Sequence, residues 1–305
     1  MFNGVPADSK TTKENIMSAI TRKEFILKST AGLAGTLLAP HFLHATPENN
    51  FTVPGPIGFQ SWVVRELIEK DFPGTMKMMA GMGFQSVEMC SPPGYAAYGF
   101  GSLQKLTATE LKKIINDAGI TCTSCHYGFE ELKKNTQERI DFAKELGLTQ
   151  MVVSMFSLPK NPSLGDWRKA CDELNVLAEQ SKKSGIQMGY HNHNHEFEKL
   201  EGQLIYDVVL GQLDATLVKM QFQVWVIIAG YKAADYFRKY PGRFISAHLS
   251  DWPGTGDKQV PLGKGTVDWN EFFDASKVGG VKNVFVEMDV ALLKESAAYL
   301  KGSRN

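Results

Sequence analysis

From residue 57 onward the chain alternates short apolar runs with longer amphipathic segments. Short runs rich in β-branched and aromatic residues predict buried strands, and amphipathic segments that end at glycine predict helices. The predicted strands are 57–62, 84–89, 120–126, 149–154, 186–191, 216–223, 243–248 and 283–289. The predicted helices are 74–82, 107–117, 130–146, 163–183, 204–210, 232–239, 267–278 and 292–300.

This alternation predicts a parallel sheet, because a helix between two strands carries the chain back to the same edge. Strand–helix repeats of this number and length fit a closed (β/α)8 TIM barrel. An open, doubly wound sheet is the structural alternative. No GxGxxG follows the first strand, which removes the main support for a dinucleotide-binding version of that sheet. No linker divides the region, so we expect one α/β domain over residues 55–305.

The first fifty residues have the character of an export signal. Residues 21–28, TRKEFILK, resemble the twin-arginine export motif, with Lys23 in place of the second arginine. An apolar run at 31–40 and a small-residue cleavage pattern at 43–45 follow. We therefore expect a signal peptide and a flexible lead over residues 1–50, and a periplasmic or otherwise exported protein. The alternative is an amphipathic first helix of the domain.

Composition narrows the partners. Lys plus Arg equals Asp plus Glu, at 33 each, so the chain lacks the positive field that binds a phosphate backbone, and we expect no nucleic-acid partner. The apolar run at 31–40 is too short to cross a bilayer, and no other stretch is apolar enough. We therefore expect no membrane span. The pair Cys122 and Cys125 lies inside a predicted strand, which favours small buried residues over a redox or zinc motif. Assembly into a homo-oligomer stays open.

Candidate chemistry gathers where the predicted strands end, because all carboxyl ends of a parallel barrel meet at one rim. The polar residues at these ends are Glu88, His126, His191, Gln223, His248 and Glu287. Residues 190–198, YHNHNHEFE, add His193 and Glu196 beside the fifth strand. Imidazoles and carboxylates in this number suit a metal site or an acid–base site. The alternative for residues 190–198 is a solvated, histidine-rich loop.

Several segments together resemble the xylose isomerase-like TIM barrels, the sugar phosphate isomerase/epimerase superfamily, over residues 56–302. They are GYHNH at 189–193, YPGR at 240–243 leading to HLSD at 248–251, GKGTVDW at 263–269 and VEMD at 286–289. The resemblance implies one divalent ion held at the ends of strands five to eight, by His191, Gln223, His248 and Glu287. It also implies that Glu88 and His126 line a sugar pocket and that Lys264 lies in a loop covering the site.

The chain departs from the family pattern at the implied ion. Gln223 stands where relatives usually have Asp, and His191 stands where many have Glu. The set of two histidines, one glutamate and one glutamine holds a single formal negative charge. That disfavours Mg²⁺ and Ca²⁺, which prefer several anionic oxygens, and suits Mn²⁺, Zn²⁺, Co²⁺ or Fe²⁺.

Such a site suits proton transfer on a small carbohydrate. A divalent ion that chelates a carbonyl and its neighbouring hydroxyl acidifies the carbon between them. Glu88 or Glu196 would take that proton, and His126 or His193 would donate one. Trp62 and Trp225 lie near strand ends and suit sugar stacking, although core packing is the commoner reason for such residues. An exported enzyme rarely meets phosphorylated sugars, so we expect an unphosphorylated substrate.

Three functions remain open. A metal-dependent carbohydrate isomerase or epimerase is the leading interpretation. A 3-keto-glycoside lyase or hydratase on the same barrel is the second, and a non-catalytic sugar-binding protein with a degenerate metal site is the third, for which Gln223 is the best argument. A DNA-repair endonuclease is disfavoured by the neutral charge, the predicted export and the scarcity of acidic ligands.

Overall fold

The computed structural model describes residues 50–302. The predicted export signal and cleavage pattern fall on residues outside this range. Within the described range no helix combines the length and the apolarity that a bilayer crossing requires.

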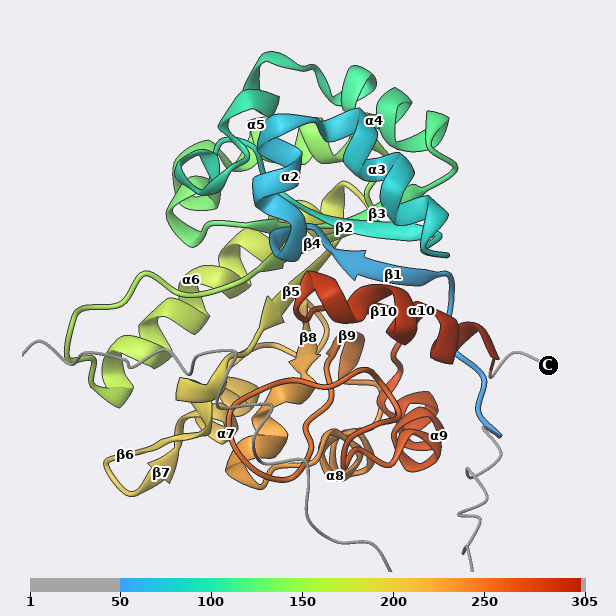
Figure 1. Cartoon of the computed structure of the whole chain (residues 1–305). Helices are drawn as coiled ribbons and strands as arrows, with labels where there is room; N and C mark the ends of the chain where they lie inside the picture. The colour runs from blue at the N-terminus through green and yellow to red at the C-terminus, as the bar shows by residue number, and fades with distance from the viewer. Residues whose placement is uncertain (1–49, 303–305) are drawn as a thin grey trace, which may run out of the picture. The chain divides into compact units, whose positions relative to one another are not determined.

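Eight parallel strands close into a barrel in the order β1-β10-β9-β8-β5-β4-β3-β2. Figure 1 labels these strands. The strands are β1 (Ile57–Gln60), β2 (Ser86–Cys90), β3 (Thr121–Tyr127), β4 (Gln150–Val153), β5 (Gln187–His191), β8 (Val218–Gln223), β9 (Phe244–Leu249) and β10 (Asn283–Val286). Closure is completed by pairing of β1 with β10, in which Phe59 lies opposite Val286. The predicted closed barrel is confirmed, and the open sheet is wrong.

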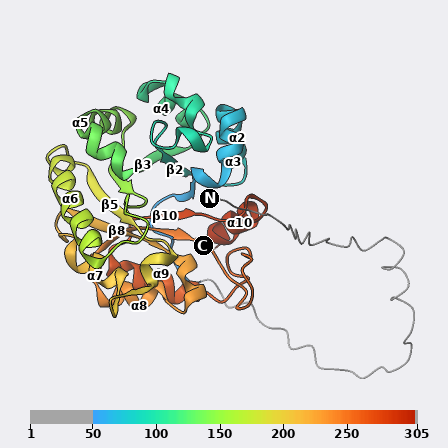
Figure 2. The ribbon, with the colours of Figure 1, turned by 90° about the vertical axis from the view of Figure 1, so that its left-hand side faces the viewer.

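Helices surround the strands, as Figure 2 shows. They are α2 (Arg65–Lys70), α3 (Phe72–Gly81), α4 (Ala108–Asp117), α5 (Phe129–Leu146), α6 (Leu164–Lys183), α7 (Ile205–Gln212), α8 (Ala233–Lys239), α9 (Trp269–Gly279) and α10 (Leu293–Gly302). Capping boxes fix the N-terminal ends of two helices. Thr107 and Glu110 form the capping box of α4, and Ser163 and Asp166 form that of α6.

Most boundaries agree with the prediction within about two residues. Three features differ. A helix, α2, precedes the one predicted at 74–82, and β10 ends at Val286, three residues early. The hairpin of β6 (Lys199–Leu200) and β7 (Gln203–Leu204) was not predicted, because strands of two residues are too short to show any alternation.

Two bulges interrupt the pairing inside the barrel. The register of β2 with β3 shifts between Val87 and Glu88, so that Glu88 lies opposite Ser124. The register of β8 with β9 shifts in the same way and sets Gln221 opposite Ser246. Bulges re-aim side chains and are frequent beside active sites. Both bulges here place polar side chains in the barrel interior.

The barrel interior has no room for a methyl group at Gly58 in β1. A Cβ there would lie 2.5 Å from the Phe285 ring and 2.8 Å from the Val284 carbonyl oxygen. We predict that Gly58→Ala lowers the free energy of unfolding by about 1–3 kcal/mol, as overpacking of a core does. The matched control is Gly211→Ala in α7, where a Cβ meets nothing within 4 Å and where alanine favours the helix. Urea denaturation checks both, and a Gly58→Ala protein as stable as the control would contradict this packing.

Candidate active site

The carboxylate of Glu88 lies fully buried beneath the carboxyl ends of the strands. Five side chains place donor nitrogens or hydroxyls 2.5–3.1 Å from its two oxygens: Gln60, Ser124, His126, Gln221 and His248. A buried charge is tolerated only when it is paired and hydrogen-bonded, and Glu88 satisfies both conditions.

The charges around Glu88 hold it ionised. Burial alone would raise the pKa of Glu88, but the imidazoles of His126 and His248 outweigh burial and hold the pKa well below its usual value. Burial likewise opposes protonation of His248, yet Glu287 and Glu88 raise the pKa of His248 to about 10. His248 is therefore a buried cation between two carboxylates. Its Nε2 faces Glu88, and its Nδ1 lies 3.0 Å from Glu287 Oε2.

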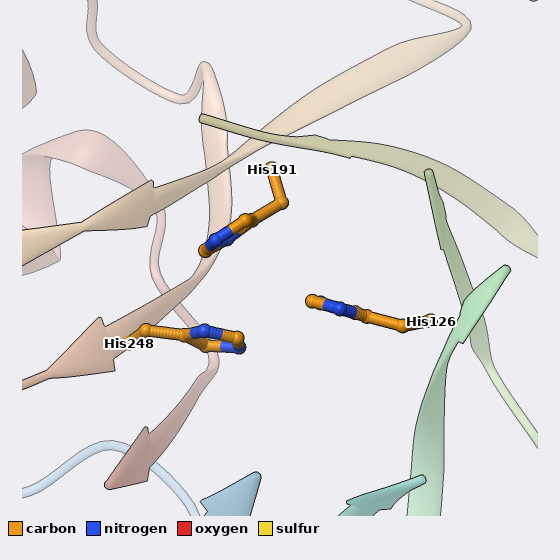
Figure 3. A group of neighbouring side chains, drawn as sticks. All are labelled: His126, His191 and His248. Atoms are coloured by element: carbon orange, nitrogen blue, oxygen red, sulfur yellow. The ribbon is translucent and has the colours of Figure 1, made fainter. Parts of the chain in front are cut away.

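Three imidazoles, from β3, β5 and β9, converge above this carboxylate. Figure 3 shows His126, His191 and His248 with their rings directed into one space. Their ring centroids are 4.4–5.2 Å apart, and one nitrogen from each ring lies within 4.8 Å of the other two. Burial and the neighbouring imidazoles hold the pKa of His191 well below its usual value, so this ring is neutral. Its Nδ1 is buried and has no hydrogen-bond partner among the described residues.

Glu287 and Gln223 complete the group. Gln223 Nε2 donates to Glu287 Oε2 at 2.5 Å, and the same oxygen faces His248. Gln223 and His248 thus both contact Glu287, and His191 lies beside His248 with ring centroids 4.4 Å apart, although Glu287 follows β10 rather than ending it. The imidazoles whose nitrogens come close enough together to hold one ion are those of His126, His191 and His248. The metal-ligand role of His191, Gln223, His248 and Glu287 stays a prediction.

The segment after β5 carries a second set of contacts. Both oxygens of Glu196 are engaged, Oε1 by the hydroxyl of Tyr190 at 2.7 Å and Oε2 by the backbone N–H of His193 at 2.8 Å. His195 Nε2 lies 3.2 Å from Oε1. His193, His195 and Glu196 are close enough to hold an ion, but the carboxylate is already occupied by these donors. Glu196 therefore fixes the turn that presents His193.

A cavity of about 260 Å³, here called the inner cavity, opens above the imidazoles. The histidines and the carboxylate that line it are His126, His191, His193 and Glu287. Trp62 also lines it, as predicted. Glu88 and Glu196 have no exposed surface and do not line the inner cavity. Proton abstraction by either carboxylate stays a prediction, and their burial favours an orienting role.

Two residues that were predicted to contact the substrate, Trp225 and Lys264, do not line the inner cavity. Trp225 is half-buried, and its backbone N–H donates to Gln223 Oε1 at 3.3 Å, but its ring does not line the inner cavity. Lys264 is exposed in the loop after β9 and does not line the cavity either. Their contact with substrate stays a prediction.

Five further residues line the inner cavity that the sequence did not single out: Cys90, Tyr95, Tyr98, Ser154 and Met155. Cys90 and Ser154 had a usable signal, since each lies at the carboxyl end of a strand. Burial raises the pKa of the Cys90 thiol well above its usual value, so this cysteine is not a thiolate nucleophile. Tyr95 and Met155 lie in loops, and Tyr98 ends the one-turn 3-10 helix Ala96–Tyr98. No periodic pattern in the sequence reveals the side-chain directions of such segments.

The donor set fits a divalent ion. His191 Nδ1 is an orphaned buried nitrogen, and the proton between His248 Nδ1 and Glu287 Oε2 occupies a place that a cation can take. The contact from His248 Nε2 to Glu88 is the carboxylate partner that commonly orients a ligating histidine. Imidazole-rich ligation with one carboxylate and one amide favours Mn²⁺, Zn²⁺, Co²⁺ or Fe²⁺.

Solved structures with the same barrel include several enzymes of sugar chemistry. A sugar phosphate isomerase/epimerase from Parabacteroides distasonis superposes with a TM-score of 0.68 at 23% identity, over 81% of this chain and 93% of that one. D-psicose 3-epimerase from Clostridium cellulolyticum, solved with D-tagatose, gives 0.59 at 15% identity over 82% and 98%. The IOLI protein, solved with a bound zinc atom, gives 0.62 at 13% identity over 82% and 96%. No curated protein matches this chain by sequence.

At these identities the structural likeness establishes a shared fold. The sequence itself matches the family described as xylose isomerase-like TIM barrel over residues 76–301, which is most of the chain. The closed barrel agrees with that match. The chain therefore belongs to the xylose isomerase-like TIM barrel family.

Proposed function

We propose that this protein is a metal-dependent carbohydrate isomerase or epimerase that moves a proton at a carbon next to a sugar carbonyl. The observation that carries the proposal is the contact of buried His248 with Glu287, which lines the inner cavity together with His191 and a neutral histidine, His193. Structural neighbours named as epimerases support the reaction class.

His191, Gln223, His248 and Glu287 would hold the divalent ion. Once bound there, such an ion would polarise a sugar carbonyl and lower the pKa of the adjacent carbon–hydrogen bond. Glu88 keeps the His248 ring fixed through Nε2 and leaves Nδ1 directed toward Glu287. Glu88 is thus a positioning residue.

His193 is the best-placed base. It lines the inner cavity, burial lowers its pKa, and its Nδ1 has no hydrogen-bond partner among the described residues. A neutral imidazole with a free nitrogen accepts a proton at neutral pH. His126, which also lines the cavity, is the candidate to return a proton to the substrate. Glu196 holds the backbone of His193 in place.

The cavity wall argues for an unphosphorylated sugar. No lysine or arginine is among the residues that line the inner cavity, so a phosphate ester would meet no cationic side chain there. The twin-arginine-like residues 21–28 support export to the periplasm, where free sugars and glycosides are the available carbohydrates. Aromatic rings at Trp62 and Tyr95 offer faces for sugar stacking.

Metal content tests the ligand assignment. We predict that His248→Ala loses bound metal and turnover while keeping the far-UV circular dichroism spectrum of the fold. Gln223→Asp adds the carboxylate that relatives carry, so its affinity for Mn²⁺ should rise about tenfold or more. Elemental analysis and calorimetric titration with Mn²⁺ measure both. Full metal content in His248→Ala, or weaker Mn²⁺ binding in Gln223→Asp, would count against the proposed site.

Isotope exchange tests the reaction. We predict that the metal-loaded protein exchanges deuterium from D₂O into the carbon next to the carbonyl of a free ketose, within a panel that includes D-tagatose. His193→Gln should slow this exchange at least about 100-fold, because a positioned base contributes that much or more. Glu198→Gln, an exposed residue of the same segment, is the matched control and should exchange at the parent rate. NMR detects the exchange, and a His193→Gln protein as fast as the control would exclude the base.

Protein stability tests the buried charge of Glu88. With metal removed by a chelator, we predict that Glu88→Gln lowers the free energy of unfolding by about 3–5 kcal/mol, since it removes the fully buried one of the two carboxylates that pair with the His248 imidazolium. Ser124→Ala removes one hydrogen bond to Glu88 and keeps the charge, so it should cost about 1.5–3 kcal/mol. Guanidinium denaturation compares the two. Equal stability of Glu88→Gln and the parent would disprove the ion network.

A further inference from the structure

A second hollow adjoins the inner cavity. This outer cleft, of about 630 Å³, lies between the loops that follow β2, β3 and β4. Tyr95, Tyr98, Ser154 and Met155 line both hollows. The two spaces therefore share a wall, and a ligand seated beside the imidazoles can extend into the cleft.

Apolar side chains stand exposed at this junction. Tyr98 is 56% exposed and Met155 is 54% exposed, which is unusual for residues of this size and apolarity. Leu158, Pro159 and Pro162 continue the apolar lining away from the inner cavity. Exposed apolar side chains that cluster around a hollow commonly mark a binding site, whereas apolar residues exposed singly do not.

The floor of the outer cleft is rigid and buried. The Phe156 ring packs against Phe129 at 5.0 Å and against Trp167 at 6.1 Å between centroids, and all three residues are buried. A fixed floor under exposed apolar walls is a preformed pocket, which binds without an ordering cost.

Charge selects the kind of ligand. No lysine or arginine is among the residues that line the outer cleft, and the imidazole of His195, which does line it, is paired with Glu196 at 3.2 Å. The two glutamates that line the cleft are already engaged. Glu131 accepts from Ser91 Oγ at 2.5 Å and faces Arg139 at 3.5 Å, and Glu130 pairs with Lys133 at 3.2 Å. The surface offered to a ligand is mainly apolar, with the hydroxyls at Tyr95 and Ser154 bonded to each other.

We propose that the outer cleft binds the aromatic or otherwise apolar aglycone of a glycoside whose sugar ring lies in the inner cavity. This inference rests on the proposed function, since it assigns the sugar to the inner cavity. Size agrees with it: pockets for drug-sized ligands typically span about 300–1,000 Å³. The inner cavity falls below that range and the outer cleft falls within it. The substrate class is thus a glycoside that has an apolar leaving or spectator group and a ketone on its sugar ring, for which a free ketose is a smaller analogue.

Paired probes test the aglycone subsite. Methyl and p-nitrophenyl glycosides of D-glucose, D-galactose, D-mannose and D-xylose are titrated into the metal-loaded full chain by calorimetry. For the sugar that binds, the p-nitrophenyl form should bind about tenfold to hundredfold tighter than the methyl form, because its ring is buried against apolar side chains.

Variants locate the effect. Leu158→Asn, which changes a residue of the outer cleft alone, should bring the affinity ratio of the two forms down at least about threefold and leave the methyl glycoside unchanged. Met155→Asn changes a mostly exposed side chain, so it keeps the fold, and it should lower the same ratio. Lys160→Asn is the matched control, since this exposed neighbour lines neither hollow, and it should keep the parent ratio.

The outcomes separate the two claims. Methyl glycosides that bind with a ratio near one contradict the outer subsite and leave the proposed function intact. Free p-nitrophenol that binds as tightly as its glycoside also contradicts the subsite, because the cleft would then act without the sugar. Failure of every glycoside to bind, with deuterium exchange into D-tagatose intact, contradicts this inference alone, and failure of both experiments contradicts the carbohydrate function as well.

Discussion

The buried carboxylate of Glu88 is the constraint on which the site depends. An anion inside a closed barrel must be met by donors from several strands, and five side chains meet it here. Two bulges supply the register for this, since they set Ser124 opposite Glu88 and Ser246 opposite Gln221. Glu88 also orients a residue beside the inner cavity, because it holds Nε2 of His248 and so directs Nδ1 of that ring toward Glu287.

The sequence predicts the barrel well because the signal is repeated. Eight apolar runs separated by helical segments leave few parallel topologies, and strand ends in a parallel barrel share one rim. That is why residues as distant as His126 and Glu287 could be expected to meet. This inference came from the polar residues at the predicted strand ends, and His126 and Glu287 both line the inner cavity.

The sequence cannot tell a residue that touches a ligand from one that supports it. Glu88 and Glu196 have the residue type of a catalytic base, yet each is fully buried and engaged by neighbours. The direction of a loop side chain is equally hidden, because it depends on tertiary packing rather than on periodicity. Tyr98 and Met155 therefore went unnoticed, while Trp225 and Lys264 were expected at a cavity that they do not line.

The proposed function requires a divalent ion that joins His191, His248 and Glu287 beside the inner cavity. Crystals of the protein loaded with Mn²⁺ or Zn²⁺, measured at the absorption edge of the metal, reveal where that ion lies. We expect an anomalous peak within about 2.0–2.3 Å of a nitrogen of each histidine and an oxygen of Glu287. A peak at His193 and His195 instead, or no peak between these three side chains in metal-loaded crystals, would contradict it.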